Sequence, residues 1–194
     1  MRSVNFALAA AVLAVAGCAA QQTAMAPAKP AVGYGKQISE ADIAPWNIDI
    51  RTPDGLGLPA GRGTVAEGKK IYDAQCLACH GADAKGGSVY GTMVGGVGSF
   101  VKGPRVLTPG SMYPYAPILF DYIRRSMPMN APQTLSADQV YALSAYILNL
   151  NGLIPAAAVM DQGTLPQVQM PNRNGFMVDD RPDTKAVRCM SNCK

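Results

Sequence analysis

The stretch Cys76-Leu77-Ala78-Cys79-His80 decides the fold that we expect for this chain. The C-x-x-C-H spacing is the attachment motif of a c-type haem. The two thiols add across the porphyrin vinyl groups as thioethers, and the adjacent imidazole ligates the iron. The motif therefore predicts one covalently bound haem c, with Cys76 and Cys79 as attachment points and His80 as an axial ligand.

His80 is the single histidine among 194 residues. A redox dithiol or half of a zinc site is the alternative, but zinc needs two further ligands at a matching spacing, and the sequence has no second C-x-x-C. One histidine also excludes a bis-histidine haem, a second haem of this type and a histidine-based catalytic triad. Any second protein ligand of the iron must be another residue type, with methionine the first candidate and cysteine the second.

The preferred second ligand is Met127. Most of the methionines that follow His80 must be packing residues, but Met127 ends an apolar helix, Pro128 fixes the backbone after it, and a loop and a capped helix follow. Met129 is the main rival, with a cysteine or an open iron site as further alternatives. Histidine–methionine ligation in an apolar shell indicates electron transfer. No other group in the chain resembles a catalytic constellation, so we expect no catalysis by this chain alone.

Three main helices are expected around the haem, in an all-α fold. Thr64-Val65-Ala66-Glu67 and Ser136-Ala137-Asp138-Gln139 are capping-box patterns, which predict helices starting there. The first runs to about Gln75, and the second runs past Leu150 to a stop at Gly152. A stripe of apolar residues with helical spacing predicts another helix over residues 116–126.

Several contacts follow from these helices. Gly68 and Tyr72 share one face of the first helix, where a glycine lets another helix cross closely, and Tyr141 and Tyr146 are candidates to meet that face. A backbone carbonyl near Pro104 is expected to support the second nitrogen of His80. Two alternatives are open for Tyr113 and Tyr115. They either close over the propionate side of the haem or pack as surface aromatic residues.

The first residues predict export. Arg2 supplies a positive end, and residues 4–16 form an apolar run too short to span a membrane. The run ends in small residues followed by Cys18, and this sequence resembles the lipobox of bacterial lipoproteins. We therefore expect residues 1–17 to be a lipoprotein signal peptide and Cys18 to be the lipidated N-terminus, which anchors the mature chain to a membrane in the bacterial periplasm. Secretory cleavage near Ala20, giving a soluble periplasmic protein, is the alternative.

The rest of the chain divides by composition. Residues 18–35 are rich in Ala, Gln and Pro and read as a flexible tether. Residues 36–63 read as an irregular extension without helix, with Trp46 and Ile48 as packing points. The haem domain covers residues 64–152. The formal charge of +4 is small and scattered, so it does not indicate nucleic-acid binding.

Residues 153–194 form a proline-broken C-terminal arm with too few apolar residues for a second core. We expect this arm to dock a partner rather than to belong to the haem fold. Cys189 and Cys193 lie at its end, four residues apart, where one helical turn brings the Cα atoms to about 6 Å, a separation that a disulfide tolerates. A local disulfide in an oxidising compartment is one interpretation, and free or partner-linked thiols are the other.

The order of these features resembles a class I cytochrome c. A closer resemblance over residues 43–194 is to the cytochrome subunit of the sulfane dehydrogenase in the periplasmic sulfur-oxidising (Sox) system. The tail motifs are its specific part, because generic cytochromes lack them. The resembling stretches are Ile43-Ala44-Pro45-Trp46-Asn47-Ile48, Tyr113-Pro114-Tyr115-Ala116, Leu119 to Arg125, Met127-Pro128, residues 142–153, Met170-Pro171-Asn172-Arg173-Asn174-Gly175-Phe176, Arg181-Pro182-Asp183, and Arg188-Cys189-Met190 with Cys193.

In that family the cytochrome accepts electrons from a molybdenum-cofactor subunit that oxidises carrier-bound sulfane sulfur. The resemblance implies His80 and Met127 as axial ligands. Some family members carry a second haem, which this chain with one histidine cannot do, and Tyr113 stands where we expect a tryptophan. The single haem is similar to that of the cytochrome subunit of periplasmic sulfite dehydrogenases, so sulfane and sulfite both stay open as the partner's substrate.

The predicted function is therefore single-electron transfer in the periplasm. The chain is expected to accept electrons from a molybdenum sulfur oxidoreductase subunit and to pass them to a downstream cytochrome c or oxidase. A free-standing, membrane-tethered electron shuttle is one alternative, although a shuttle does not need the long tail. A haem sensor with an open iron site is another, and the Met127-Pro128 pair argues against it.

Overall fold

The computed structural model describes residues 35–181. Cys18, Cys189 and Cys193, with the predicted signal peptide and most of the predicted tether, lie outside the described residues. The chain divides into one unit that ends at Pro45 and another that begins at Trp46. The described part of the first unit contains α2 (Glu40–Ile43), begun by a capping box between Ser39 and Asp42. This single turn corrects the expectation that residues 36–63 contain no helix.

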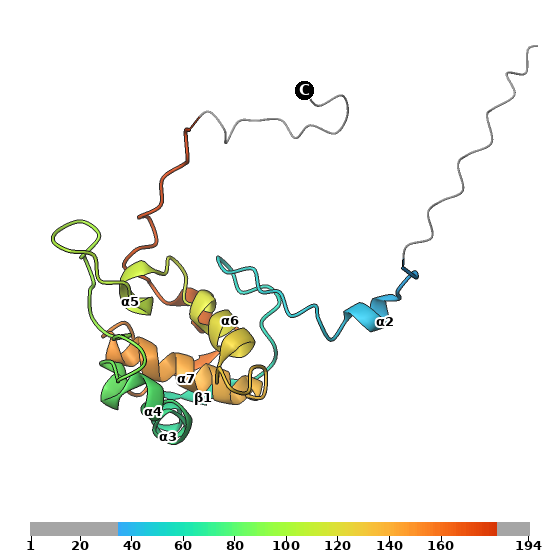
Figure 1. The fold of residues 1–194 in the computed structure, drawn as a ribbon. Coiled ribbons are helices and arrows are strands. Elements are labelled where there is room, and N and C mark those ends of the chain that lie inside the picture. Colours follow the sequence, from blue (N-terminus) through green and yellow to red (C-terminus); the bar gives the residue numbers. More distant parts are fainter. Residues whose placement is uncertain (1–34, 182–194) are drawn as a thin grey trace, which may run out of the picture. The chain divides into compact units, whose positions relative to one another are not determined.

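The three predicted main helices are confirmed: α3 (Val65–Gln75), α6 (Pro117–Ser126) and α7 (Ala137–Leu150) (Figure 1). The capping boxes at Thr64 and Ser136 are both formed, each with the side chain and backbone hydrogen bonds that the pattern predicts. They satisfy amide groups that have no partner within a first helical turn. The sequence signals at these helix starts were therefore sufficient to place them.

The end of α7 is also where the sequence predicts it. Gly152 has a φ of 71°, its N–H donates to the Asn149 carbonyl, and the N–H of Leu153 donates to the Leu148 carbonyl. This pair of bonds closes the last turn as a Schellman motif, in which a glycine adopts the left-handed conformation at no steric penalty. The chain then reverses and returns over the domain.

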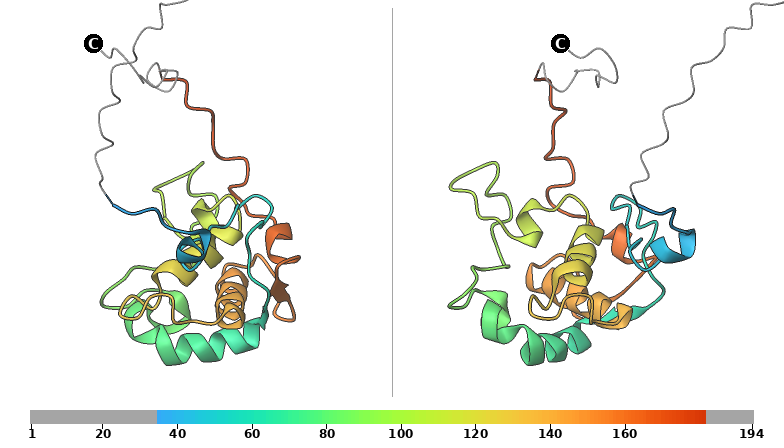
Figure 2. Two further views of the ribbon diagram at one scale, coloured as in Figure 1. Left: turned by 90° about the vertical axis from the view of Figure 1, so that its right-hand side faces the viewer. Right: turned by 45° about the vertical axis from the view of Figure 1, so that its right-hand side comes forward.

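The crossing of α3 and α7 depends on Gly68. A Cβ atom at this position would overlap the carbonyl of Ala142 and lie 2.8 Å from the Cβ of Tyr146. The rings of Tyr72 and Tyr146 are 5.3 Å apart at the same crossing. Both views in Figure 2 show α3 crossing α7 and lying against it. Tyr146 meets the glycine face as predicted, but Tyr141 does not, because its ring packs on Phe120 at 4.4 Å.

A small antiparallel sheet accompanies the helices. The all-α prediction did not include this sheet. It pairs β1 (Arg62–Thr64) with β2 (Val159–Asp161), and Gly63 lies opposite Met160. A Cβ on Gly63 would lie 2.7 Å from the Cβ of Ala142, so this glycine also lets the chain lie against α7. The sheet ties a segment before the haem motif to one after the last helix.

The expectation that residues 153–194 lie outside the haem fold is wrong for their first half. After Gly152 the chain forms β2 and the short 3-10 helix η3 (Leu165–Gln167), and its apolar side chains enter the same core as α6 and α7. These side chains are too few and too irregularly spaced to show a period, but each fills a gap in a core that other elements have built. The buried residues of this segment are Ile154, Met160, Leu165, Val168 and Met170.

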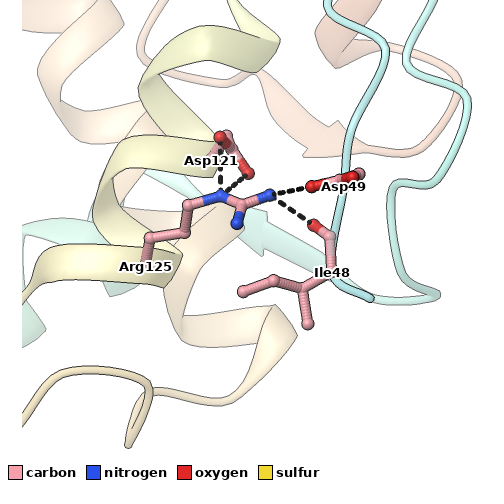
Figure 3. A network of polar contacts seen from close by, with 4 residues as sticks. All are labelled: Ile48, Asp49, Asp121 and Arg125. Carbon is pink, nitrogen blue, oxygen red and sulfur yellow. Dashed lines mark hydrogen bonds and ion pairs between the residues drawn. The ribbon is translucent and has the colours of Figure 1, made fainter. Parts of the chain in front are cut away.

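The segment that precedes β1 is held on α6 by Arg125. The Arg125 Nε donates to both carboxylate oxygens of Asp121, at 2.8 and 2.9 Å, and Nη2 donates to the Ile48 carbonyl at 3.1 Å and to Asp49 at 2.8 Å (Figure 3). Ile48 is half-buried. Trp46 is 82% exposed, so the prediction that it is a packing point is wrong.

Three short helices complete the domain. They are α4 (Leu77–His80), η2 (Ala82–Ala84) and α5 (Pro109–Met112). Between η2 and α5 the chain runs through a glycine-rich loop, residues 85–108. Within residues 35–181, no helix has the length and apolar character that crossing a membrane requires.

Candidate haem site

The C-x-x-C-H motif occupies one helical turn. Cys76 ends α3 and begins α4, and its carbonyl accepts hydrogen bonds from the N–H groups of Cys79 at 3.2 Å and His80 at 3.0 Å. Gly81 ends the turn with a φ of 74°, a conformation that favours glycine. The Tyr72 hydroxyl donates to the Gly81 carbonyl at 2.8 Å, so α3 fixes both ends of the motif.

This turn forms one wall of a cavity of about 590 Å³. The structure brings Cys76, Cys79, His80 and Met127 together as lining residues of this one cavity, although Met127 is 47 positions (127 − 80) after His80 in the chain. The opposite walls are apolar side chains from α6, from α7 and from the loop between them. These are Leu119, Ile123, Leu135, Leu143 and Ile147.

The character of the cavity fits a porphyrin. An apolar chamber with a few polar groups on one wall is what a large flat cofactor requires. Burial lowers the pKa of His80, which favours the neutral imidazole that ligates metals. The Nδ1 atom of His80 is buried without a hydrogen-bond partner among the described residues. A carbonyl near Pro104 was expected to support this nitrogen, but that contact is not formed and Pro104 is exposed.

The thiols do not have the properties of a redox dithiol. Burial, and to a smaller extent the neighbouring Cys79, raises the pKa of Cys76 to about 11. A dithiol that exchanges disulfides needs a lowered pKa, because the thiolate is the reactive form. The environment of Cys76 therefore favours a role other than disulfide exchange.

The two candidate methionines have different surroundings. Met127 lies directly after α6, donates its N–H to the Ile123 carbonyl at 3.0 Å, and is half-buried against the core. Met129 also lines the cavity but is 65% exposed, and its sulfur accepts a hydrogen bond from the Tyr90 hydroxyl at 3.0 Å. Of the two, Met127 is the one held by the core.

Tyr90 is a site residue that sequence reasoning missed. Its ring stacks on His80 with a centroid separation of 5.1 Å and an interplanar angle of 22°. It lies in the glycine-rich loop, where no periodic pattern marks one side chain above its neighbours. Only the folded loop brings this ring to the motif.

Tyr113 and Tyr115, the two tyrosines that we expected either over the propionate side or on the surface, lie in different surroundings. Tyr113 lines the cavity, and burial raises the pKa of its hydroxyl. Tyr115 is half-buried and its ring lies 5.0 Å from the Arg173 guanidinium carbon. Only Tyr113 therefore forms part of the cavity wall.

Comparisons with known proteins agree with this geometry. The family described as "Cytochrome c" matches residues 65–151. The thiosulfate dehydrogenase of Allochromatium vinosum is 28% identical over 102 residues, which cover 50% of this chain and 32% of that protein, so the chain spans about a third of its length. A chain in the crystal structure of the sulfane dehydrogenase SoxCD from Paracoccus pantotrophus is 37% identical, with a TM-score of 0.71 over 84% of this chain and 82% of that chain.

Proposed function

Because this chain belongs to the cytochrome c family and has its class I fold with covalently bound haem c, we propose that it is the electron-accepting subunit of a dehydrogenase for sulfur compounds. The bound haem supplies an iron that gains and loses one electron. The observation that carries the proposal is an apolar cavity lined by two thiols, one imidazole and one thioether.

Each of these residues has a defined role in the proposal. Cys76 and Cys79 would form the thioether bonds to the haem, and the helical turn between them sets the separation of their side chains. His80 and Met127 would be the protein ligands that hold the haem iron. The apolar side chains of α6 and α7 exclude water, which lets the charge of the site change with little rearrangement.

The proposed partner is a molybdenum-cofactor subunit, with a downstream cytochrome c or oxidase as electron acceptor. Two similar proteins support the sulfur chemistry, since one is named a sulfane dehydrogenase and the other a thiosulfate dehydrogenase. The substrate class is therefore a reduced sulfur compound, with sulfane sulfur and sulfite as the candidates.

Exposed apolar residues suggest where the partner binds. Tyr122 and Met129 line the cavity and are 52% and 65% exposed, so they present an apolar rim beside the haem. Residues 176–178 follow the buried part of the tail, and Phe176, Met177 and Val178 are 64%, 93% and 92% exposed. A short apolar segment behind a fixed anchor raises the effective concentration of a partner near the haem.

Purification of the native protein tests the proposal. We expect a molybdenum subunit to co-purify with the wild type and to be lost when residues 176–178 are all replaced by serine. A matched control replaces three exposed apolar residues of the glycine-rich loop by serine: Val97, Val101 and Leu107. Fully loaded haem protein that never co-purifies with a molybdenum subunit would instead support the free-standing shuttle.

Export and anchoring are part of the proposal. We propose a bacterial periplasmic location with Cys18 as the lipidated N-terminus, supported by the apolar run and the small residues before that cysteine. The variant Cys18→Ser should release the haem protein from membranes or block its processing. Mass spectrometry that finds an unmodified N-terminus at another residue would contradict the anchor.

The terminal cysteines are proposed to form a local disulfide. Support comes from the four-residue separation of Cys189 and Cys193 and from the oxidising compartment. Alkylation before and after reduction should find both thiols reactive only after reduction. Two reactive thiols in the native protein would reject the bridge.

A further inference from the structure

The turn that carries Arg173 is fixed to the domain through Met170 and Asn172. Met170 is 3% exposed and its carbonyl accepts the N–H of Arg173 at 3.1 Å. Beside it, the Asn172 side-chain amide donates to the Met112 carbonyl at 2.8 Å, at the end of α5. The backbone carbonyl of Asn172 accepts a hydrogen bond from the N–H of Gly175 at 3.0 Å. Arg173 therefore belongs to a turn that hydrogen bonds hold on the domain.

The Arg173 guanidinium has one buried nitrogen without an acceptor among the described residues. Its central carbon lies 5.0 Å from the Tyr115 ring centroid, so it is attracted to the face of that ring. The Nη1 atom is buried, yet none of residues 35–181 accepts a hydrogen bond from it. Buried donors are almost always satisfied in folded proteins, and an unpaired charged donor is the most unfavourable kind. The geometry calls for an anionic acceptor at this atom.

This turn is hydrogen-bonded to α5, whose ends contribute to the cavity wall. Pro109 begins α5 and Tyr113 directly follows it, and both of these residues line the haem cavity. The Met112 carbonyl, which anchors Asn172, lies between them in the chain. The tail turn is thus attached to the short helix whose two ends form part of the cavity wall.

We infer that the Nη1 group of Arg173 donates a hydrogen bond to a haem propionate. A c-type haem carries two propionate carboxylates, which are anionic and match the donor geometry of a guanidinium. The inference rests on the proposed haem site and adds a positioning residue from the tail to it. A cation at this place favours the reduced haem, because it stabilises the added electron through the Coulomb interaction.

The test uses the full-length haem-loaded protein and its midpoint reduction potential. Arg173→Gln removes the charge and the matching donors, and we expect a lower potential and a shift of the propionate bands in the redox-difference infrared spectrum. Arg173→Lys keeps the charge and should restore most of the potential but not the wild-type infrared bands. The control is Arg181→Gln, which removes one charge from an exposed position of the same tail and should match the wild type.

The outcomes are distinguishable. A wild-type chain without covalently attached haem would overturn the haem site itself. If Arg173→Gln keeps its haem, potential and infrared bands, Arg173 does not contact a propionate. A variant that is only less stable to heat, with unchanged potential and bands, assigns Arg173 to tail packing and overturns the inference. The same holds if the isolated protein is unchanged and only co-purification of the molybdenum subunit is lost, because the acceptor is then a carboxylate of the partner.

Discussion

The Tyr90 hydroxyl donates a hydrogen bond to the Met129 sulfur at 3.0 Å, and the Tyr90 ring stacks on His80. This contact holds Met129 on the side of the glycine-rich loop, whereas Met127 packs against the core. The relationship separates two methionines that the sequence ranked by the helix end before Met127, by Pro128 after it and by the loop and capped helix that follow.

The first prediction concerns the iron ligand. Met127→Ala should abolish the weak near-infrared sulfur-to-iron band of the oxidised protein, because the thioether that the core holds is removed. Met129→Ala should keep the band and serves as the matched control. Retention of the band in Met127→Ala with loss in Met129→Ala would reverse the assignment.

The helix crossing gives the second prediction. Gly68→Ala should lower the free energy of unfolding by roughly 1–3 kcal/mol, the usual effect of adding a methyl group to a filled interface. A Cβ there would overlap the backbone of α7, so the two helices would have to move apart. Gly163→Ala is the control, since its Cβ would meet only the Asp161 carboxylate at 3.5 Å. Thermal unfolding of both haem-loaded variants measures the difference, and equal stabilities would contradict the close crossing.

A third prediction separates the two halves of the tail. A chain that ends after Gly152 should fail to fold or lose its haem, because it lacks β2 and the buried side chains that follow. A chain that ends after Gly175 should keep its haem and its thermal stability. The single variant Leu165→Ala should destabilise the full chain by about 2–5 kcal/mol, as for other fully buried leucines. A stable, haem-loaded chain ending at Gly152 would restore the view that the tail lies outside the fold.

The fourth prediction concerns Arg125. Replacing it by methionine removes both carboxylate contacts and the bond to the Ile48 carbonyl, at an expected loss of roughly 1–2 kcal/mol. The larger effect should be local: hydrogen exchange should accelerate over residues 46–52, while the haem spectrum stays unchanged. Arg124→Met removes the same charge from the same helical turn, and unaltered exchange there is the expected control result. Equal exchange in both variants would show that Arg125 does not hold the segment.

The last prediction is the response to alkaline pH. Burial, followed by repulsion from Asp161, raises the pKa of Tyr141 from 10.0 to about 12. A raised pKa in the folded state means that the unfolded chain loses this proton first, so the stabilising contribution is complete below pH 10 and is lost as the pH rises to about 12.

The variant Tyr141→Phe isolates this effect. At pH 7 this variant should lose only the hydrogen bond to the Pro59 carbonyl, which lowers the free energy of unfolding by about 1 kcal/mol. Its unfolding free energy should then fall less steeply with pH than that of the wild type above pH 10. Denaturant unfolding at a series of pH values measures the slopes, and parallel curves would show that Tyr141 titrates alike in both states.

Local signals in the sequence determined the haem motif and the main helices. The C-x-x-C-H turn, the capping boxes at Thr64 and Ser136 and the stop at Gly152 each depend on residues within a few positions of one another. Such contacts depend on residue types and their spacing in the chain, so the sequence is enough to predict them. The close approach at Gly68 was also predictable, because a glycine on an apolar helix face has few other uses.

Only the tertiary structure decided the rest of the site and the place of the tail. Tyr90, Trp46 and Arg173 carry no periodic signal, and their surroundings depend on segments distant in the chain. The residues of β2 and η3 are too few to build a core, yet they complete one that α6 and α7 have already formed. A residue that fills a gap is defined by the shape of that gap, which exists only after the chain has folded.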